Sequence, residues 1–376
     1  METTRSEVSP DVRTEPGRFA AVYQILQEAV DARAFPGCAF GVLAHGNMVL
    51  QDALGHFTYE DDAPAVKPCT IFDVASLTKI VSTTAAAMLL YQRGQLDLDQ
   101  PLGDLLPGFI VGREDAKSAR RVTLRNLLAH NSGLPGYVEF FRTVSTPAQL
   151  FRACLELPLQ AAPGERGEYS DPGFILLGKA LEMITGEPLA EWSRKHVFER
   201  LSLNATRFSP QADTRSLIPP TEIDQTFRHR VIQGEVQDEN AFVLQGVAGH
   251  AGLFSDVPDL LRFAGEILVS LNFSSASATL FTGSTVNTFA DRQGPAGSSR
   301  ALGWDTPSED SSAGRHFSSR SIGHLGYSGC SLWIDLAAET AAVLLTNRTW
   351  PDRQNQAIKQ VRPAFHDAVR EALTFV

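Results

Sequence analysis

The sequence predicts an α+β protein whose antiparallel sheet is assembled from both ends of the chain. Strand patterns lie near the two ends of the 376 residues, and helical patterns fill the middle. The strands do not alternate with helices, as they would in a βαβ protein. We therefore expect the first and last helices to flank the sheet and a mostly helical region to be inserted between its strands.

The chain opens with a polar leader, one helix and two strands. Residues 1–17 are polar and are expected to be a disordered leader. Residues 19–30 carry apolar side chains at helical spacing. Residues 38–43 and 48–54 have strand patterns, and a turn at residues 45–47 joins them.

The middle of the chain carries the signals of several helices. A segment rich in alanine and leucine begins at Ser76 and stops at Gly94. Thr123 is placed to cap a short helix over residues 124–130. Further helices are expected with Pro172 in the first turn and Gly186 just past the end, and over residues 188–201.

The last part of the chain returns to strands and ends in a helix. Residues 207–255 and 270–320 show no regular pattern, and we expect loops there that cover a binding site. Residues 331–336 and 341–346 predict a hairpin, and residues 358–373 predict a closing helix.

These elements predict one domain with two lobes after the leader. The domain spans residues 18–376. Its sheet lobe combines residues 18–75 with residues 300–376, and its helical lobe spans residues 76–299.

The composition disfavours several classes of protein. The formal charge of −10 opposes nucleic-acid binding, which needs a basic surface. The longest uninterrupted apolar run, residues 85–91, is far shorter than the roughly 20 residues that span a bilayer, and the first residues lack the apolar core of a secretory signal. Four scattered cysteines form neither a disulfide framework nor a zinc motif. We expect a cytoplasmic protein without membrane span, nucleic-acid partner, metal or cofactor, its oligomeric state left open.

Ser76 and Lys79 form a Ser-x-x-Lys pair at the start of a predicted helix. Three residues apart on a helix, the two side chains share a face. A serine hydroxyl is a weak nucleophile until a base removes its proton, and an ordinary lysine with a pKa of about 10.4 is a poor base at pH 7. Apolar neighbours favour burial of Lys79, which would lower its pKa by about 2–3 units. Alternatively, Ser76 only caps the helix and Lys79 is solvated.

Five stretches of the chain resemble the motifs of one enzyme superfamily. They are FDVASLTK at 72–79, LLAHNSGLP at 127–135, YSD at 169–171, GVAGHAG at 246–252 and HLG at 324–326. Their content and order are similar to the serine β-lactamase and penicillin-binding superfamily. They most resemble its class C β-lactamase-related branch, which includes the family VIII carboxylesterases. The resemblance implies a β-lactamase/transpeptidase-like α/β sandwich.

The resemblance implies a role for each matching residue. Ser76 would be the acylated nucleophile, with Lys79 and Tyr169 as its general-base partners. The backbone N–H groups of Ser76 and Tyr327 would form the oxyanion hole. A lysine cation favours a neighbouring phenolate, so Lys79 and Tyr169 could share one proton. Without the other motifs, Tyr169 would be an ordinary partly buried tyrosine.

The last motif departs from the family pattern. His324 and Leu325 stand where many β-lactamases have lysine and threonine, and together with Gly326 this segment would contact the substrate. A histidine with a pKa of about 6.5 is mostly neutral at pH 7, and leucine has no hydroxyl. Anion recognition should therefore be weak, which disfavours penicillins and peptide C-termini more than neutral esters. Alternatively, His324 is only a structural strand residue.

Asp171 is the second departure, because it stands where the family has an asparagine that contacts the lysine and the substrate. A carboxylate cannot donate a hydrogen bond, and beside Lys79 it would raise the lysine pKa. We favour the interpretation that Asp171 is the N-cap of the helix that begins at Pro172, with a secondary role in orienting Lys79.

Three functions remain open from the sequence. The favoured one is a serine hydrolase that acylates Ser76 and takes small-molecule substrates, most of all carboxylic esters or lactones. The alternative is a β-lactamase or D-alanyl-D-alanine carboxypeptidase acting on an amide, which the lack of a secretory signal disfavours because peptidoglycan lies outside the cytoplasm. A non-catalytic ligand-binding protein on the same scaffold is disfavoured by the complete set of Ser76, Lys79 and Tyr169.

Overall fold

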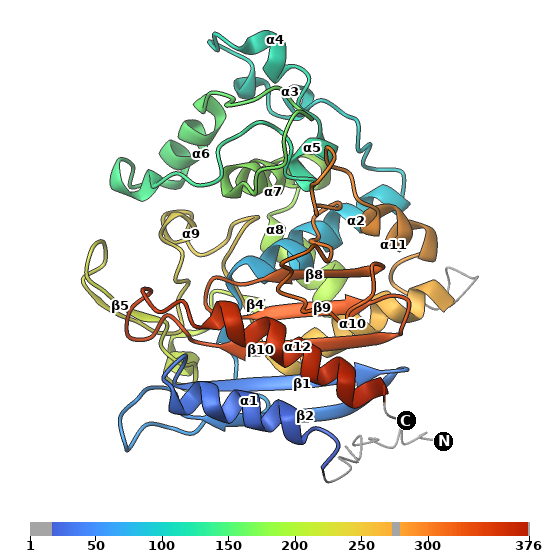
Figure 1. The fold of residues 1–376 in the computed structure, drawn as a ribbon. Coiled ribbons are helices and arrows are strands. Elements are labelled where there is room, and N and C mark those ends of the chain that lie inside the picture. The colour runs from blue at the N-terminus through green and yellow to red at the C-terminus, as the bar shows by residue number, and fades with distance from the viewer. Residues whose placement is uncertain (1–16, 273–278, 375–376) are drawn as a thin grey trace, which may run out of the picture.

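The computed structural model describes residues 17–272 and 279–374. Residues 1–16 of the predicted leader and residues 273–278 of the predicted loop over 270–320 lie outside these ranges. Figure 1 shows a sheet with helices on its faces and a mostly helical region above it. The α+β arrangement predicted from the sequence is confirmed.

A five-stranded antiparallel sheet has the order β2-β1-β10-β9-β8. The strands are β1 (Gly37–Ala44), β2 (Asn47–Gly55), β8 (Ser321–Leu325), β9 (Ser331–Asp335) and β10 (Thr340–Thr346). Cys38 of β1 pairs with Leu54 of β2 on one side and with Thr346 of β10 on the other. The sheet is therefore built from both ends of the chain, as predicted.

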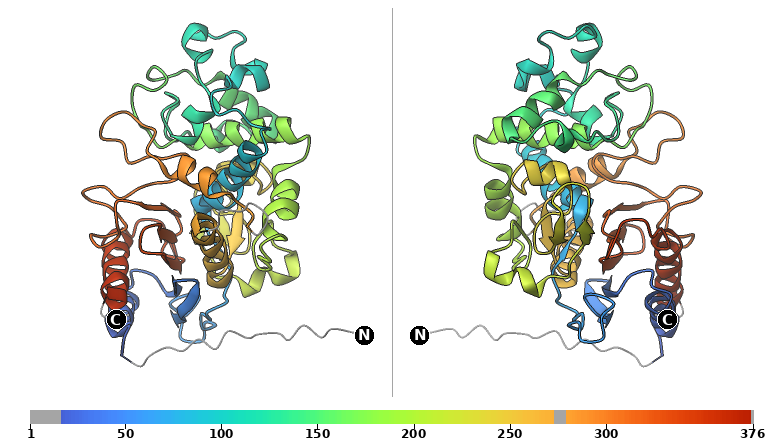
Figure 2. Two further views of the ribbon diagram at one scale, coloured as in Figure 1. Left: turned by 90° about the vertical axis from the view of Figure 1, so that its right-hand side faces the viewer. Right: turned by 90° about the vertical axis from the view of Figure 1, so that its left-hand side faces the viewer.

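Helices cover both faces of this sheet. α1 (Ala20–Asp31) and α12 (Ile358–Thr374) lie side by side on one face (Figures 1 and 2). Phe40, Trp333 and Phe365 are fully buried in the core beneath them. α10 (Val257–Asn272) packs against β1 and β10 from the other face. The first and last helices thus flank the sheet, as predicted.

The helix predicted over residues 76–94 is interrupted. It consists of a 3₁₀ turn (Ala75–Leu77), a π-helix (Lys79–Thr84) and α2 (Ala85–Gln92). Hydroxyl groups of the π-helix bond outside the helix: Ser82 Oγ lies 2.8 Å from Ser193 Oγ, and Thr83 Oγ1 donates to the Gly249 carbonyl over 2.7 Å. π-helical turns are rare and are frequent at functional sites, and helix periodicity in a sequence does not reveal them.

The helices expected after Thr123 and from Pro172 are present as α5 (Leu124–Leu128) and α7 (Asp171–Thr185). Further helices of the described ranges are α3 (Leu102–Leu105), α4 (Ala116–Ala119), α6 (Pro147–Glu156), α8 (Leu189–Ser193), α9 (Glu239–Val243) and α11 (Gly283–Ala290). α11 lies inside the loop expected over residues 270–320, so that expectation is wrong there. Thr123 caps α5 as predicted, and Gly186 ends α7 in a left-handed conformation. The helix expected over 188–201 is α8 followed by a π-helix (Arg194–Phe198). No helix of the described ranges is both long and apolar enough to cross a bilayer.

Residues 207–255 are not the irregular loop that the sequence suggests. They contain β4 (Arg207–Phe208), β5 (Glu222–Asp224), β6 (Arg230–Ile232) and β7 (Leu253–Ser255). β7 pairs with β4 and with β3 (Phe72–Asp73), the strand that leads to Ser76. Strands of two or three residues are too short to show an alternating pattern, so they escape sequence reading.

Candidate active site

Ser76 lies on a turn that is held from both sides. The preceding residue, Ala75, has a φ of +47°, a conformation that is uncommon for residues other than glycine. Thr78 Oγ1 donates to the Ala75 carbonyl over 2.6 Å and accepts the Leu253 N–H over 3.0 Å, which joins the turn to β7. Ala75 and Leu77 are buried while Ser76 is partly exposed. The turn therefore keeps the serine accessible.

Two side chains donate hydrogen bonds to the Ser76 hydroxyl. Lys79 Nζ donates to Ser76 Oγ over 3.0 Å, and the Tyr169 hydroxyl donates to the same oxygen over 2.8 Å. Lys79 stands at the start of the π-helix, and Tyr169 comes just before α7. Lys79 is fully buried, as its apolar neighbours predicted. The structure thus brings together the three side chains whose catalytic roles the family resemblance implies.

All three N–H groups of the Lys79 ammonium have an acceptor. Besides Ser76 Oγ, Nζ donates to Asp171 Oδ1 over 2.7 Å and to the His250 carbonyl over 3.1 Å. His250 is fixed in turn, because its Nε2 lies 2.9 Å from Asp238 Oδ1. Only a protonated amine can donate three hydrogen bonds, so this arrangement favours the charged form of the lysine.

The N-cap interpretation of Asp171 is wrong. Ser170 caps α7, because its hydroxyl accepts the Gly173 N–H over 3.1 Å. Asp171 is the first residue of the helix and bonds to Lys79 instead. Serine and aspartate are almost equally good N-caps, so capping preference could not separate the two positions. The tertiary contact with Lys79 decides between them.

The Asp171 carboxylate reverses the shift expected for Lys79. Burial alone would lower the pKa of Lys79, but the charge and hydrogen bond of Asp171, together with Tyr169, outweigh burial and raise it. Burial also raises the pKa of Tyr169, against the opposing charge of Lys79 and with a further increase from Asp171. The expected lowering of the lysine pKa is therefore wrong. At neutral pH the resting site holds an ammonium and a neutral phenol.

Four basic side chains surround the Tyr169 ring. Lys79 Nζ lies 4.7 Å and Arg300 Cζ lies 5.2 Å from the ring centroid. The rings of His130 and His324 have centroids 4.6 Å and 5.8 Å away. Burial holds the pKa of each imidazole well below its usual value, so both are neutral at pH 7. The permanent positive charges beside Tyr169 come from Lys79 and Arg300.

His324 and Arg300 together define the other side of the site. His324 Nδ1 lies 2.8 Å from the Leu325 carbonyl, and its buried Nε2 has no partner among the described residues. Arg300 Nη1 lies 3.7 Å from Asp305 Oδ2, and within the described part of the chain the Arg300 guanidinium makes no hydrogen bond. Arg300 is not among the residues expected from the sequence, because an arginine in a loop rich in serine and glycine matches no motif.

The end of β8 lies against the turn that carries Ser76. A Cβ on Gly326 would lie 2.5 Å from the Val74 carbonyl oxygen, so only glycine allows this contact. Tyr327, whose N–H is the second donor of the predicted oxyanion hole, has a half-exposed ring 4.5 Å from the Arg348 guanidinium carbon. Arg348 also donates to the Tyr327 carbonyl over 2.9 Å. Both the ring and the peptide of Tyr327 are therefore fixed.

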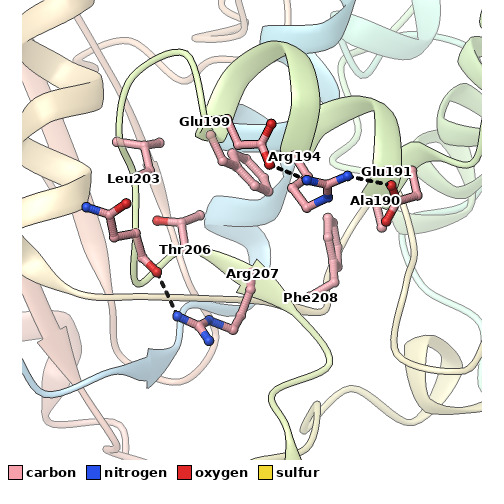
Figure 3. Close-up of a pocket in the computed structure, with 10 residues that line it drawn as sticks. Ala190, Glu191, Arg194, Glu199, Leu203, Thr206, Arg207 and Phe208 are labelled. Atoms are coloured by element: carbon pink, nitrogen blue, oxygen red, sulfur yellow. Dashed lines mark hydrogen bonds and ion pairs between the residues drawn. The ribbon is translucent and has the colours of Figure 1, made fainter.

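A separate hollow of about 380 Å³ lies beside α8, its π-helical continuation and β4 (Figure 3). Its Arg194 pairs with Glu191 and Glu199, and its Arg207 donates to the Asn204 carbonyl over 2.6 Å. None of the predicted site residues lines this hollow. Its two arginines already have partners, and the hollow is separate from the site at Ser76.

Comparison with known proteins decides the family. The family model described as Beta-lactamase matches residues 22–363. The chain belongs to the β-lactamase family. This β-lactamase-family chain is 30% identical over 373 residues to N-acetylmuramyl-L-alanine amidase of Bacillus subtilis (strain 168), with 88% of this chain and 81% of the relative covered. It is 29% identical over 356 residues to a putative D-alanyl-D-alanine carboxypeptidase of Salmonella typhimurium, with 86% and 81% covered.

Solved structures agree with this assignment at the level of the fold. The structure described as "EstCE1, a hydrolase with promiscuous acyltransferase activity" superposes with a TM-score of 0.73 at 22% identity, over 94% of this chain and 98% of that one. The β-lactamase/transpeptidase-like fold implied by the sequence motifs is confirmed. The chain is a serine hydrolase of the β-lactamase fold.

Proposed function

We propose that this chain acts through an acyl-enzyme on Ser76 and takes small carboxylic esters or lactones as substrates. The observation that carries the proposal is the pair of hydrogen bonds to Ser76 Oγ, from Lys79 Nζ over 3.0 Å and from the Tyr169 hydroxyl over 2.8 Å. The neutral His324 supports uncharged substrates, because it offers a carboxylate no charge at the position where many β-lactamases have lysine.

Attack on the substrate begins when Ser76 loses its proton. The acceptor is the Tyr169 oxygen, after the coupled Lys79 and Tyr169 have released one proton and Lys79 stays an ammonium held by Asp171. Ser76 Oγ then bonds to the carbonyl carbon. The proton passes from Tyr169 to the leaving oxygen as the C–O bond breaks. A water molecule then gives a proton to the same tyrosine as its oxygen bonds to the acyl carbon. The bond from this carbon to Ser76 Oγ breaks, Oγ takes the proton back from Tyr169, and the carboxylic acid leaves.

The developing oxyanion and the substrate need groups on the other side of Ser76. The N–H groups of Ser76 and Tyr327 would bind the oxyanion as charge develops. Gly326 holds Tyr327 close to the turn of Ser76 through its contact with Val74. His324, Gly326 and Asp171 would contact the substrate near these two N–H groups. The side chain of Tyr327, which supplies the second N–H, is half exposed.

Intact-mass measurement after exposure to p-nitrophenyl esters tests this proposal. The wild type is expected to gain the mass of the acyl group, and Ser76→Ala is expected not to. Ser82→Ala is the matched control, because Ser82 is a buried serine six residues further on whose hydroxyl, among the described residues, bonds only to Ser193. Acylation that survives in Ser76→Ala would contradict the proposal. Ligand binding that Ser76→Ala leaves unchanged, with no ester turned over, would instead favour a non-catalytic binding protein.

A second candidate function is hydrolysis of an amide bond, as in a D-alanyl-D-alanine carboxypeptidase or a β-lactamase. The names of the two curated relatives favour it, since both describe enzymes of amide bonds. Arg300 also favours it, because its guanidinium beside Tyr169 supplies a charge that a substrate carboxylate could meet.

A substrate panel separates the two candidates. Nitrocefin and an N-acylated D-alanyl-D-alanine peptide are compared with the p-nitrophenyl esters on the same preparation. The ester proposal predicts kcat/KM values for the esters that exceed those for both amides. Amide turnover that equals or exceeds ester turnover would replace it with the second candidate.

A further inference from the structure

Asp73 is a buried carboxylate that binds the backbone of two segments around the site. It is 2% exposed and ends β3, three residues before Ser76. Its Oδ1 accepts the Ala75 N–H over 2.8 Å, and its Oδ2 accepts the Gln237 N–H over 2.7 Å. Within the described ranges it forms no ion pair with a basic side chain. A buried charge without a cation is costly, so these N–H groups must stabilise it.

The bond to Ala75 acts on the residue next to the nucleophile. Ala75 has a φ of +47°, a conformation that residues with a Cβ rarely adopt. The Asp73 carboxylate gives the Ala75 N–H an acceptor in this conformation. The peptide that follows Ala75 carries the N–H of Ser76. The carboxylate therefore fixes the direction of the first donor of the oxyanion hole.

The backbone carbonyl of Asp73 is bonded to the residue that follows Tyr327, the second donor of the predicted oxyanion hole. Ser328 Oγ donates to the Asp73 carbonyl oxygen over 2.7 Å, and Ser328 directly follows Tyr327. On the other side of Tyr327, Gly326 is in close contact with the Val74 carbonyl. The segment that carries the Tyr327 N–H is thus tied to the strand that carries Asp73.

We propose that Asp73 is the positioning residue of the oxyanion hole, holding the peptides of Ser76 and Tyr327 at a fixed spacing. Its side chain orients the peptide of Ser76 through the Ala75 N–H, and its carbonyl oxygen holds the peptide of Tyr327 through Ser328. The inference rests on the proposed function, because an oxyanion hole matters only where Ser76 is acylated. Asp73 touches no substrate, so its effect is on the transition state through the two N–H groups.

The charges around Asp73 supply a readout that a purely structural residue lacks. Burial raises the pKa of Asp73 to about 6, the N–H groups of Gln237 and Ala75 oppose this, Asp238 adds to it and Arg228 lowers it. Cys330 also faces the Asp73 carbonyl, and burial raises the pKa of its thiol to about 11, so it stays neutral. Below about pH 6 the protonated carboxyl has one oxygen that no longer accepts an N–H bond.

Asp73→Asn tests the proposal, with Asp335→Asn as the matched control. The asparagine keeps one acceptor oxygen and turns an NH₂ group toward the other N–H. Asp335 is also fully buried and accepts the N–H groups of Ser318, Ala337 and Ala338. It differs from Asp73 in also accepting the Ser318 hydroxyl and in lying 3.8 Å from Arg370, and it stands at the end of β9 away from the Ser76 turn. The thermal unfolding transition of each variant, compared with that of the wild type, checks that the variants fold.

We expect Asp73→Asn to lower kcat for a p-nitrophenyl ester by about 10–100-fold, less than the loss of a whole oxyanion donor, with KM changed by less than about 3-fold. Affinity for an alkyl boronic acid, which forms a tetrahedral adduct with Ser76 Oγ, should fall by a similar factor. Affinity for the carboxylic acid product should stay within about 3-fold. Asp335→Asn should leave all three values close to wild type.

The pH profile adds a second readout. Just below about pH 6, log kcat/KM of the wild type should fall with a slope clearly greater than 1, because Asp73 protonates in addition to the catalytic pair. In Asp73→Asn the slope should remain about 1. Ser328→Ala, which removes the bond to the Asp73 carbonyl and a longer contact of 3.3 Å with Cys330 Sγ, should cost about 3–10-fold in kcat and serves if Asp73→Asn does not fold.

Two results would overturn the inference. Equal losses in Asp73→Asn and Asp335→Asn would make Asp73 an ordinary buried residue. Boronic acid affinity that stays at the wild-type value while kcat falls would place the effect outside the oxyanion hole. Failure of the proposed function looks different, because the wild type itself would then neither turn over esters nor bind the boronic acid.

Discussion

The two sides of the Ser76 hydroxyl differ in how they treat charge. On one side, the Lys79 ammonium is buried and neutralised by Asp171 at 2.7 Å. On the other side, the imidazole of His324 is neutral, and the nearby Arg300 guanidinium has its carboxylate neighbour, Asp305, at 3.7 Å. The first side pairs its cation closely with a carboxylate beside the serine, and the second leaves a more loosely paired cation over the Tyr169 ring.

This comparison shows why motif residues alone do not define the electrostatics of the site. Asparagine is replaced by Asp171 and lysine by His324, which adds one negative charge and removes one positive charge from the family pattern. Arg300, from a loop outside every motif, restores a positive charge beside Tyr169. The charge balance of the site therefore depends on a residue that no motif includes.

The largest expected effect comes from the phenol that lies between the two sides. Tyr169→Phe removes the proposed proton acceptor and should lower kcat for an ester by about 10³-fold. Tyr23→Phe is the matched control, since Tyr23 also donates a hydrogen bond, to Asp52, but packs on Phe40 beneath α1. Steady-state kinetics of both variants measure the difference. A loss below about 10-fold in Tyr169→Phe would remove the tyrosine from the proposed mechanism.

Asp171→Asn removes the negative charge on the Lys79 side of the site. Asp171 raises the pKa of both Lys79 and Tyr169, so its neutral replacement should lower both. The rate depends on the deprotonated pair and rises with pH, so the profile of kcat/KM should move to lower pH by about one unit or more. Activity at pH 7 should then increase about 10-fold. A profile that does not move would show that Asp171 does not control the proton of the pair.

Arg300→Gln removes the positive charge on the other side of the site. The cation should matter only for substrates that carry a carboxylate, so kcat/KM for a hemisuccinate ester should fall by about 3–10-fold while its neutral amide analogue is unaffected. Arg292→Gln is the control, because Arg292 comes from the same loop but already donates to Thr306. Equal losses for both substrates would mean that Arg300 acts on Tyr169 and not on the substrate.

His324→Asn should have the smallest effect. The buried imidazole is already neutral, so exchanging it for a neutral amide should change kcat/KM by less than about 3-fold. The pH profile should show no step near pH 6.5 that the variant removes. A clear loss confined to anionic substrates would show that His324 carries charge during the reaction, contrary to its burial.

Features that depend on local chemistry were predictable from the sequence. Pro172 in the first turn and Gly186 past the end define α7, and apolar periodicity defines α1 and α12. The Ser76, Lys79 and Tyr169 side chains meet as their motifs implied. Each of these signals lies within one element or one motif.

Features that depend on tertiary contacts were not predictable. The choice of Ser170 over Asp171 as N-cap depends on Lys79, which is distant in sequence. The π-helix after Lys79 depends on hydrogen bonds to other segments. Asp73 gave a weak signal, since an acidic residue in an apolar strand must find buried partners. Its partner Gln237 could not be named before the chain was folded.

The position of β10 between β1 and β9 has a consequence for how the protein is made. A nascent chain that has exposed the nucleophile turn still lacks Tyr327 and the strand that joins the two ends of the sheet. Pairing strands so far apart in the chain is a slow step with a high contact order. In the proposed mechanism, Ser76 therefore gains the N–H of Tyr327 only once the strands from the end of the chain have joined the sheet.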